Sequence, residues 1–480
     1  MKLPLSALVV LLAYVIGLTA FGTWLGRKRR SVQDYFLAGR SVPWWAIAAC
    51  IVATETSTLT FIGVPGQAYL GNWGFLQLVF GYVVGRFLIA LLFLPAYFRG
   101  AIYTSYELLQ KRFGGGAVRA TSAGIFLAYR TVGDGIRLHA AGLVLSLAAG
   151  VPEWWCIALL GIAMILYTEE GGVTATIWTD AIQMFVYLLG ALVCLVAVVR
   201  LLPDGVAGAM AAASAAGKLQ VVTTALDFTK PYTLWAGLVG GAFLTLATHG
   251  TDHYLVQRLL VAKSQKDASV GLVLSGFLVL AQFTLFLFLG TLFWAHYGGR
   301  PFARGDEVLP TFVSTELSGP LVGFILAAIV AAAMSPSLNS MASTTVRDFY
   351  LPYVRRDADE ASQMRVGRFF TVFWGLAQML LAVAAQNVQS ALDKGLAALS
   401  YASGPTVGAF LLGVLTRSAT SAGTIAGMLT GLLVTFSLAT WAGMAWTWNV
   451  AVGALVTTAV GWTASQLLPK PAALTEPETQ

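Results

Sequence analysis

The stretch that decides the fold is Ala53-Thr54-Glu55-Thr56-Ser57-Thr58-Leu59-Thr60. It places one carboxylate and five hydroxyl groups inside an otherwise apolar segment that runs from about residue 44 to residue 65. An ionisable group in the hydrocarbon core of a bilayer costs at least ~2.5 kcal/mol unless it faces a cavity or a partner. We therefore interpret the stretch as the unwound, pocket-lining centre of a membrane helix, with Glu55 as a candidate functional residue.

The composition around this stretch is that of a polytopic membrane protein. Hydrophobic residues make up 57% of the 480 residues and charged residues 11%, and the mean hydropathy is +0.75. Such a chain has too little polar surface for a soluble globule of this size. The net charge of +7 is spread over short loops, so nucleic acid is excluded as a partner. The three cysteines lie in apolar stretches without metal-ligand spacing, which indicates packing residues.

About thirteen segments are long and apolar enough to cross ~30 Å of hydrocarbon. We expect these spans at 4–25, 43–65, 74–98, 119–149, 153–168, 174–202, 232–262, 268–298, 319–347, 364–388, 392–416, 419–442 and 445–468. The first span and its basic stop occupy residues 1–30, two C-terminal helices occupy 419–468, and residues 469–480 are expected to be a disordered tail.

The basic residues predict the orientation. With the N-terminus outside, 19 of the 29 lysines and arginines fall at cytoplasmic ends, seven fall outside and three lie within spans. Because basic residues concentrate in cytoplasmic loops, we predict a multi-pass protein of the plasma (inner) membrane, in contact with the lipid bilayer. Its N-terminus is expected outside and its C-terminus in the cytoplasm.

A second apolar span is interrupted in the same way, by Thr245-Leu-Ala-Thr248-His249-Gly250-Thr251-Asp252-His253. Interrupted helices at matching positions of two halves point to a transporter built from inverted repeats, with its binding site near the midplane of the bilayer. We therefore predict an all-α fold with two discontinuous helices, in which residues 43–202 and 232–416 form two five-helix repeats. Backbone groups freed by unwinding need partners in lipid, which a bound cation and a substrate would supply.

Three charged residues share one face of the fourth span. Arg130, Asp134 and Arg137 stand at positions i, i+4 and i+7, and two arginines against one aspartate predict a net positive charge. They either form a structural ion-pair ladder or offer an uncompensated guanidinium to a substrate carboxylate. Arg86 either adds to this positive interior or pairs with Glu55. The candidate substrate-binding residues are Thr54, Glu55, Ser57, Thr60, Arg86, Arg130, Asp134, Arg137, Thr248 and His249.

A candidate cation site involves the ninth span. Pro336 frees the carbonyl of Ala332, and the Ser335 hydroxyl lies beside it. A monovalent cation is bound by several oxygens that replace its water shell, and the opening stretch adds further carbonyls. Asp180, near the start of the sixth span, is a lone carboxylate that could simply extend to the membrane interface.

Several motifs follow one another between about Phe36 and Gly427. They include Phe36-Leu-Ala-Gly-Arg-Ser-Val-Pro-Trp-Trp-Ala, Gly171-Gly-Val-Thr-Ala-Thr-Ile-Trp178-Thr-Asp180, Val256-Gln-Arg258, and Leu338-Asn-Ser340 through Asp348-Phe-Tyr350. Together they resemble the sodium/solute symporter family, which includes glucose, proline, iodide, sialic-acid and monocarboxylate carriers. The resemblance implies a ten-helix core of the leucine-transporter type, one extra helix before it and two after it, and Na⁺ as the coupling ion.

The resemblance also implies roles for single residues. The main sodium site would take backbone carbonyls from Ala53 and Thr56, and Asp180 matches an aspartate associated with a second cation site in some members. In the ninth span, one alignment places the paired hydroxyls of the family on Ala332 and its neighbour Ala333. The other places one hydroxyl on Ser335 and the second on Pro336. The candidate cation ligands are therefore Ala53, Thr56, Asp180, Ala332 and Ser335.

Two further positions bear on the substrate. Glu55 matches a position that acts in cation or substrate binding in relatives. Thr248 and His249 fall where sugar carriers place aromatic residues, so a sugar is less expected. His249 is also the side chain whose charge can change near neutral pH.

These features predict a secondary active transporter that imports a small organic solute with sodium by alternating access, and an organic anion is the expected substrate. The alternative is a sodium- or proton-coupled amino- or imino-acid symporter, with Glu55 or His249 carrying the proton. A membrane sensor module is disfavoured because only a short tail follows the last span. An enzyme is not expected, since no nucleophile–base pair or phosphate loop occurs. The substrate identity and the oligomeric state stay open.

Overall fold

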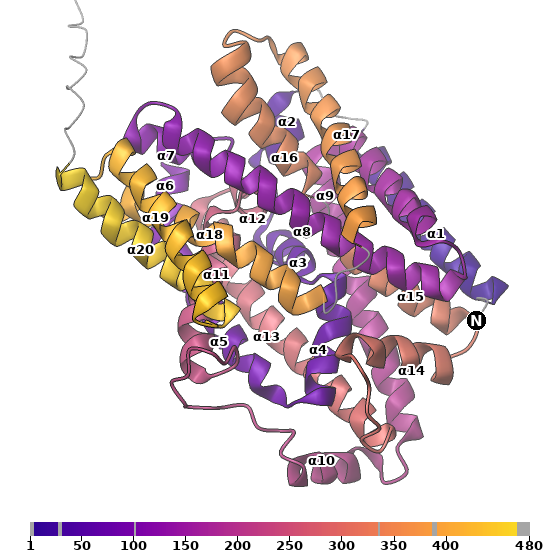
Figure 1. Ribbon diagram of the computed structural model, residues 1–480. Coiled ribbons are helices and arrows are strands. Elements are labelled where there is room, and N and C mark those ends of the chain that lie inside the picture. The colour runs from indigo at the N-terminus through magenta and orange to yellow at the C-terminus, as the bar shows by residue number, and fades with distance from the viewer. Residues whose placement is uncertain (1–3, 27–30, 100–101, 335–336, 386–390, 468–480) are drawn as a thin grey trace, which may run out of the picture.

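The computed structural model describes residues 4–26, 31–99, 102–334, 337–385 and 391–467, and it forms a bundle of helices (Figure 1). The helices of at least twelve residues are α1 (Leu5–Gly26), α3 (Trp44–Glu55), α4 (Thr58–Leu70), α5 (Leu76–Leu92), α8 (Ala117–Ala149), α9 (Glu153–Leu201), α13 (Gln265–His296), α15 (Pro320–Ala333), α17 (Glu360–Ala384), α18 (Ala391–Leu415), α19 (Ser421–Trp441) and α20 (Trp446–Leu467). The shorter helices are α2 (Val32–Leu37), α6 (Leu94–Phe98), α7 (Tyr106–Phe113), α10 (Gly205–Ala215), α11 (Gly241–Thr245), α12 (His253–Leu260), α14 (Val308–Glu316) and α16 (Leu338–Thr344).

Short 3₁₀ and π-helical segments join or extend these helices. They are η1 (Ala38–Arg40), η2 (Trp73–Phe75), η3 (Ala236–Gly240), η4 (Leu246–Thr251), η5 (Gly305–Glu307) and η6 (Thr345–Val354). The basic stop at residues 27–30 and the whole predicted tail, 469–480, lie outside the described residues.

The helix lengths agree with a polytopic membrane protein. Among the described residues, seven helices are long and apolar enough to cross a membrane, or eight if α3 and α4 count as one broken span. The 49-residue helix α9 covers two predicted spans and is interrupted at Gly172, whose backbone has φ 55° and ψ −159°. A side chain at Gly172 would lie 2.7 Å from the Tyr35 carbonyl oxygen, so only glycine suits this bend. The count of thirteen spans, the division into repeats and the orientation stay predictions.

The outer helices flank a core made from the broken helices. α1 packs against α9 and α15, whereas α19 and α20 pack against each other and against α18 on the opposite side of the bundle (Figure 1). Small residues permit these close contacts, as membrane helices require when no hydrophobic force drives them together. An added Cβ at Gly323, for example, would lie 2.3 Å from the Ala7 carbonyl oxygen.

The first broken helix interrupts at the predicted place. α3 ends at Glu55, and α4 begins at Thr58 with Ser57 as its N-cap, whose hydroxyl accepts a hydrogen bond from the Thr60 amide at 3.3 Å. The two halves are bent by 62°. The Thr58 hydroxyl donates to the Ile329 carbonyl at 3.1 Å and so holds the break against α15.

The second broken helix interrupts at Asp252, two residues after the glycine that suggested it. The π-helical segment η4 ends at Thr251, and Asp252 is extended, with φ −68° and ψ 117°. The Asp252 carboxylate then caps α12 by accepting a hydrogen bond from the Tyr254 amide at 2.8 Å. The Tyr97 hydroxyl donates to the Gly250 carbonyl, which the unwinding has freed. Both predicted interruptions are therefore present.

Candidate functional site

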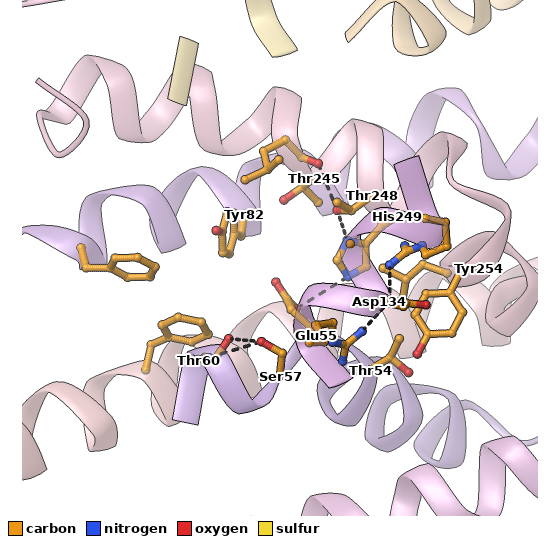
Figure 2. Close-up of a pocket in the computed structure, with 17 residues that line it drawn as sticks. Thr54, Glu55, Ser57, Thr60, Tyr82, Asp134, Thr245, Thr248, His249 and Tyr254 are labelled. Carbon is orange, nitrogen blue, oxygen red and sulfur yellow. Dashed lines mark hydrogen bonds and ion pairs between the residues drawn. The ribbon is translucent and has the colours of Figure 1, made fainter. Parts of the chain in front are cut away.

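A cavity of about 120 Å³ lies between the two broken helices and is also bounded by α5, α8 and α13 (Figure 2). Nine of the ten predicted substrate-binding residues line it, and the tenth, Arg86, does not: the nine are Thr54, Glu55, Ser57, Thr60, Arg130, Asp134, Arg137, Thr248 and His249. Eight lining residues were not among the predicted site residues: Phe75, Tyr82, Gly133, Leu244, Thr245, Tyr254, Leu255 and Phe283. The cavity thus combines polar groups from three predicted spans with aromatic walls.

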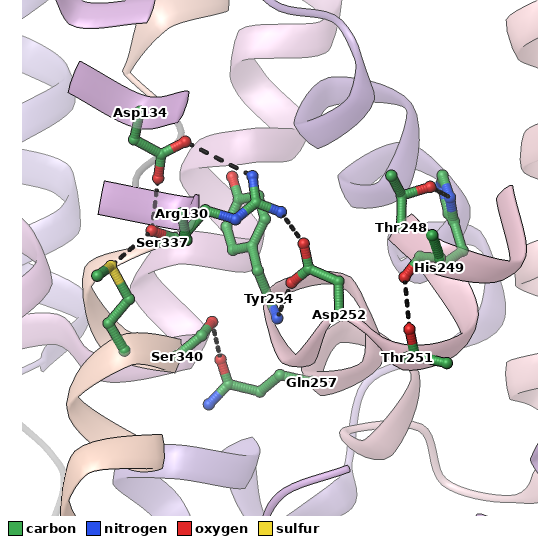
Figure 3. A network of polar contacts seen from close by, with 12 residues as sticks. Arg130, Asp134, Thr248, His249, Thr251, Asp252, Tyr254, Gln257, Ser337 and Ser340 are labelled. Carbon is green, nitrogen blue, oxygen red and sulfur yellow. Dashed lines mark hydrogen bonds and ion pairs between the residues drawn. The ribbon is translucent and has the colours of Figure 1, made fainter. Parts of the chain in front are cut away.

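One wall of the cavity is charged. Arg130 pairs with Asp252 from the second broken helix, and its Nη1 lies 3.6 Å from Asp134 Oδ1 (Figure 3). The expected net positive charge on this face is therefore wrong, because a carboxylate distant in sequence balances the second arginine. Arg130 also lies over the Tyr254 ring, with its Cζ 4.5 Å from the ring centroid.

Arg137 is the less engaged of the two arginines. Its Nη1 lies 3.4 Å from Asp134 Oδ1, but its buried Nε and Nη2 have no hydrogen-bond partner among the described residues. A buried donor without an acceptor costs free energy, and a guanidinium presents its donors in a fork that matches a carboxylate. Arg137 is consequently the lining residue best arranged to receive an anionic ligand.

Asp134 connects this wall to the segments that follow α15. Its Oδ2 accepts hydrogen bonds from the Ser337 hydroxyl at 2.5 Å and the Gln378 side-chain amide at 3.4 Å, as Figure 3 shows for Ser337. Asp134 thus uses Oδ1 for the arginines and Oδ2 for neighbouring helices. The carboxylate is held in place before any ligand arrives.

The other polar end of the cavity is formed by Glu55 and His249. Glu55 forms an ion pair with Arg86, and its Oε2 lies 3.6 Å from His249 Nε2. The Thr248 hydroxyl lies 2.8 Å from His249 Nδ1 (Figure 2). Arg86 is itself held by the Ser275 hydroxyl at 3.1 Å, so it positions Glu55 from behind rather than facing the cavity. Of the two interpretations of Arg86, the structure shows the pair with Glu55.

The four predicted cation ligands within the described residues, Ala53, Thr56, Asp180 and Ala332, are not among the residues that line the cavity. In the described part of the chain, the backbone carbonyls of Ala53 and Thr56, at the end of α3, accept no hydrogen bond from a backbone amide of the break or of α4. Ala332 is buried in the last turn of α15, where carbonyls lack intrahelical partners. These oxygens suit a hard monovalent cation. Ser335 and Pro336 lie outside the described residues, so their register stays a prediction.

Asp180 does not extend to the membrane interface. It is fully buried, and its Oδ2 lies 3.4 Å from Arg258 Nη2 and 3.2 Å from the Thr54 hydroxyl. The interfacial interpretation is therefore wrong, because the helix packs this carboxylate against α12 and α3. Arg258 is likewise buried. Here a guanidinium already balances the carboxylate proposed for a second cation.

Among the network residues outside the predicted site set, Asp252 carried a signal in the sequence, although it pairs with Arg130 and does not line the cavity. Asp252 stands in the second interrupted stretch, where a carboxylate at membrane depth needs a partner such as Arg130. Ser337 and Gln378 carry no such signal, because hydroxyl and amide groups are common in helices and their contacts depend on tertiary packing.

Comparison with known proteins identifies the family. The model of the sodium:solute symporter family matches residues 35–431. The chain belongs to this family. The symporter is 28% identical to the sodium-coupled monocarboxylate transporter 2 of Bos taurus over 437 residues, which cover 88% of the symporter and 70% of that protein. It is 26% identical to the sodium/sialic acid symporter NanT of Aliivibrio fischeri over 477 residues, covering 95% and 92% of the two chains.

Solved structures agree on the fold. A Na⁺-coupled sialic acid symporter in a substrate-bound outward-open state superposes with a TM-score of 0.90 at 23% identity, covering 97% of the symporter and 98% of that chain. The nucleobase-cation-symport-1 family transporter Mhp1 gives a TM-score of 0.57 at 15% identity. The predicted family, the all-helical leucine-transporter-like fold and Na⁺ as the coupling ion are confirmed. The symporter is a membrane protein that couples solute import to sodium.

Proposed function

We propose that this symporter imports a small organic anion and binds its carboxylate through Arg137. The observation that carries the proposal is the pair of buried Arg137 donors, Nε and Nη2, that have no partner in the described chain and belong to a side chain lining the cavity. A carboxylate would satisfy both donors at once. The monocarboxylate and sialic acid carriers among the relatives act on substrates of this class, which supports the proposal.

The charges in the bundle explain why such an anion would travel with sodium. Buried arginines and carboxylates pair within the described core, as Arg86–Glu55, Arg130–Asp252, Arg137–Asp134 and Arg258–Asp180. An anion alone would leave this interior with a net negative charge, which is costly at membrane depth. A sodium ion bound at the break of the first helix would cancel that charge. By reciprocity, each would raise the affinity for the other.

Replacement of Arg137 tests the proposal. We expect Arg137→Gln to raise the KM for sodium-driven uptake of a carboxylate by roughly tenfold to a hundredfold, because a hydrogen bond to a charged group is worth about 1.5–3 kcal/mol. Uptake into proteoliposomes, with the substrate first chosen by a thermal-shift screen of organic acids, amino acids and sugars, measures the effect. Arg304→Gln, which removes a partly exposed arginine that is paired with Asp306 outside the cavity, is the matched control. An unchanged KM in Arg137→Gln would contradict the proposal.

A second candidate is an amino or imino acid. Glu55 lines the cavity together with Arg137, so an amine and a carboxylate of one small molecule could meet opposite charges. The pairing of Glu55 with Arg86 weakens this candidate, because the carboxylate is already neutralised. Coupling to protons on Glu55 or His249 is the corresponding alternative to coupling by sodium.

A further inference from the structure

A second cavity lies near the N-terminal end of α8, where α7, the start of α8 and η6 meet. Its volume is about 470 Å³, and it shares no lining residue with the first cavity. Its lining residues are Glu107, Gln110, Arg119, Arg347, Leu351, Pro352 and Arg356. The charge pattern of the sequence predicts that this end of the molecule faces the cytoplasm.

Arg119, which lines this cavity, pairs with two carboxylates. Arg119 Nε lies 2.5 Å from Asp348 Oδ1, and Arg119 Nη2 lies 3.5 Å from Glu107 Oε1. Asp348 Oδ1 also accepts a hydrogen bond from the Thr104 hydroxyl at 2.8 Å, and Glu107 Oε2 accepts one from the Tyr103 amide at 3.0 Å. Both carboxylates are thus directed toward Arg119 and the segment before α7.

The other two arginines of the cavity have no carboxylate partner among the described residues. The Arg347 guanidinium lies over the Tyr103 ring, 3.6 Å from its centroid, and its buried Nε lacks a hydrogen-bond acceptor. Arg356 Nε donates only to the Pro352 carbonyl of its own segment, at 3.3 Å. Arg347 and Arg356 therefore both line the cavity without a described carboxylate partner, and the Nε of Arg347 is buried without an acceptor. Bidentate recognition by arginine is typical of phosphate sites.

We propose that this cavity binds a phosphate group, carried by the headgroup of an anionic phospholipid. The apolar residues beside the arginines favour a lipid over a soluble ligand. Leu351 and Pro352 line the cavity, and the next two residues, Tyr353 and Val354, are 60% and 73% exposed. An aromatic and an aliphatic side chain exposed next to arginines are typical of the boundary between headgroups and acyl chains. A soluble phosphate ester shares the same chemistry and is distinguished by the experiment.

The test measures binding to the delipidated, full-length symporter. Native mass spectrometry and thermal shift would be recorded with short-chain phosphatidylglycerol, with short-chain phosphatidylcholine, and with glycerol 3-phosphate as the soluble arm. We expect saturable binding of phosphatidylglycerol, weakened about tenfold in Arg347→Gln and in Arg356→Gln. Arg355→Gln, which removes a neighbouring exposed arginine outside the cavity, should leave the binding of phosphatidylglycerol unchanged. Arg347→Lys keeps the charge and guards against misfolding.

Each outcome decides the proposal. Preferential binding of phosphatidylglycerol that both cavity variants weaken supports a lipid headgroup site. Binding of glycerol 3-phosphate with equal strength and the same dependence on Arg347 and Arg356 keeps the phosphate site but overturns the lipid as its source. Equal weakening in all three glutamine variants, or none in any, overturns the site, because the attraction would then be general surface charge or absent.

Discussion

At the scale of single residues, the sequence and the structure lead to different interpretations of Glu55. In the sequence it is an isolated carboxylate in an apolar segment, which marks it as a cation or substrate ligand. In the structure it lines the cavity, but Arg86 neutralises it and His249 lies beside it. The pair therefore acts as a unit, and removing one partner leaves the other buried without compensation.

We expect Glu55→Gln to lower the Tm and sodium-driven uptake together, because breaking a buried pair costs about 3–5 kcal/mol. The double variant Glu55→Gln/Arg86→Gln removes both charges and should recover carboxylate uptake. Thermal unfolding in detergent and uptake into proteoliposomes are the two measurements. A stable double variant that still fails to transport would show that Glu55 itself contacts the substrate or the cation, as the amino-acid candidate requires.

The residue pairs were the least predictable part of the site. Sequence spacing places Arg130, Asp134 and Arg137 on one helical face, and they do share one wall of the cavity. Spacing says nothing of Asp252, which arrives from a helix more than a hundred residues away. The partner of Asp180 was missed for the same reason, since Arg258 belongs to α12 and meets Asp180 of α9 only through tertiary packing.

At the scale of elements, the broken helices were predictable because their signal is local. Polar residues in an apolar run need backbone or cavity partners at membrane depth, so the interruption follows from solvation alone. The location of the second break was less predictable. The break lies at Asp252 rather than at Gly250, because the Asp252 side chain can cap the next helix. The bend within α9 depends on Gly172, where the approach of Tyr35 excludes a side chain.

Close packing of α5 on the second broken segment gives a stability prediction. A Cβ added to Gly81 would lie 2.1 Å from the Gly237 carbonyl oxygen, so Gly81→Ala must push η3 and α5 apart. We expect a destabilisation of about 1–3 kcal/mol, as for other overpacked sites. Thermal unfolding in detergent measures it. Gly17→Ala in α1 is the control, because no atom lies within 4 Å of the added Cβ. Equal Tm values for the two variants would contradict the prediction.

At the scale of the whole molecule, the fold followed from hydropathy and from two interrupted helices, and the family comparison confirmed it. The cation site could be predicted only in part. Thr56 lies in the break and Ala53 in the last turn of α3 before it, whereas the contribution of the ninth span depends on an alignment register around Ser335. That register requires a count of residues through an irregular segment, which hydropathy does not provide.

Coupling gives the prediction at this scale. We expect the apparent affinity for the substrate to rise with sodium concentration. A cation that stabilises the binding-competent form raises the affinity for the substrate, and the substrate raises the affinity for the cation by the same factor. Uptake would be measured in vesicles under an inward sodium gradient without a pH gradient, and then with the gradients exchanged. Transport that follows the pH gradient and ignores sodium would contradict this expectation and favour a proton on Glu55 or His249.

The pairing of four arginines with four carboxylates in the core also bears on energetics. A membrane voltage does work only on charge that moves through it. If the empty carrier is neutral in its interior, and one sodium ion enters with one monovalent carboxylate, neither half of the cycle carries net charge. Such a carrier would accumulate its solute from the sodium concentration difference alone, and each additional sodium ion would make transport electrogenic.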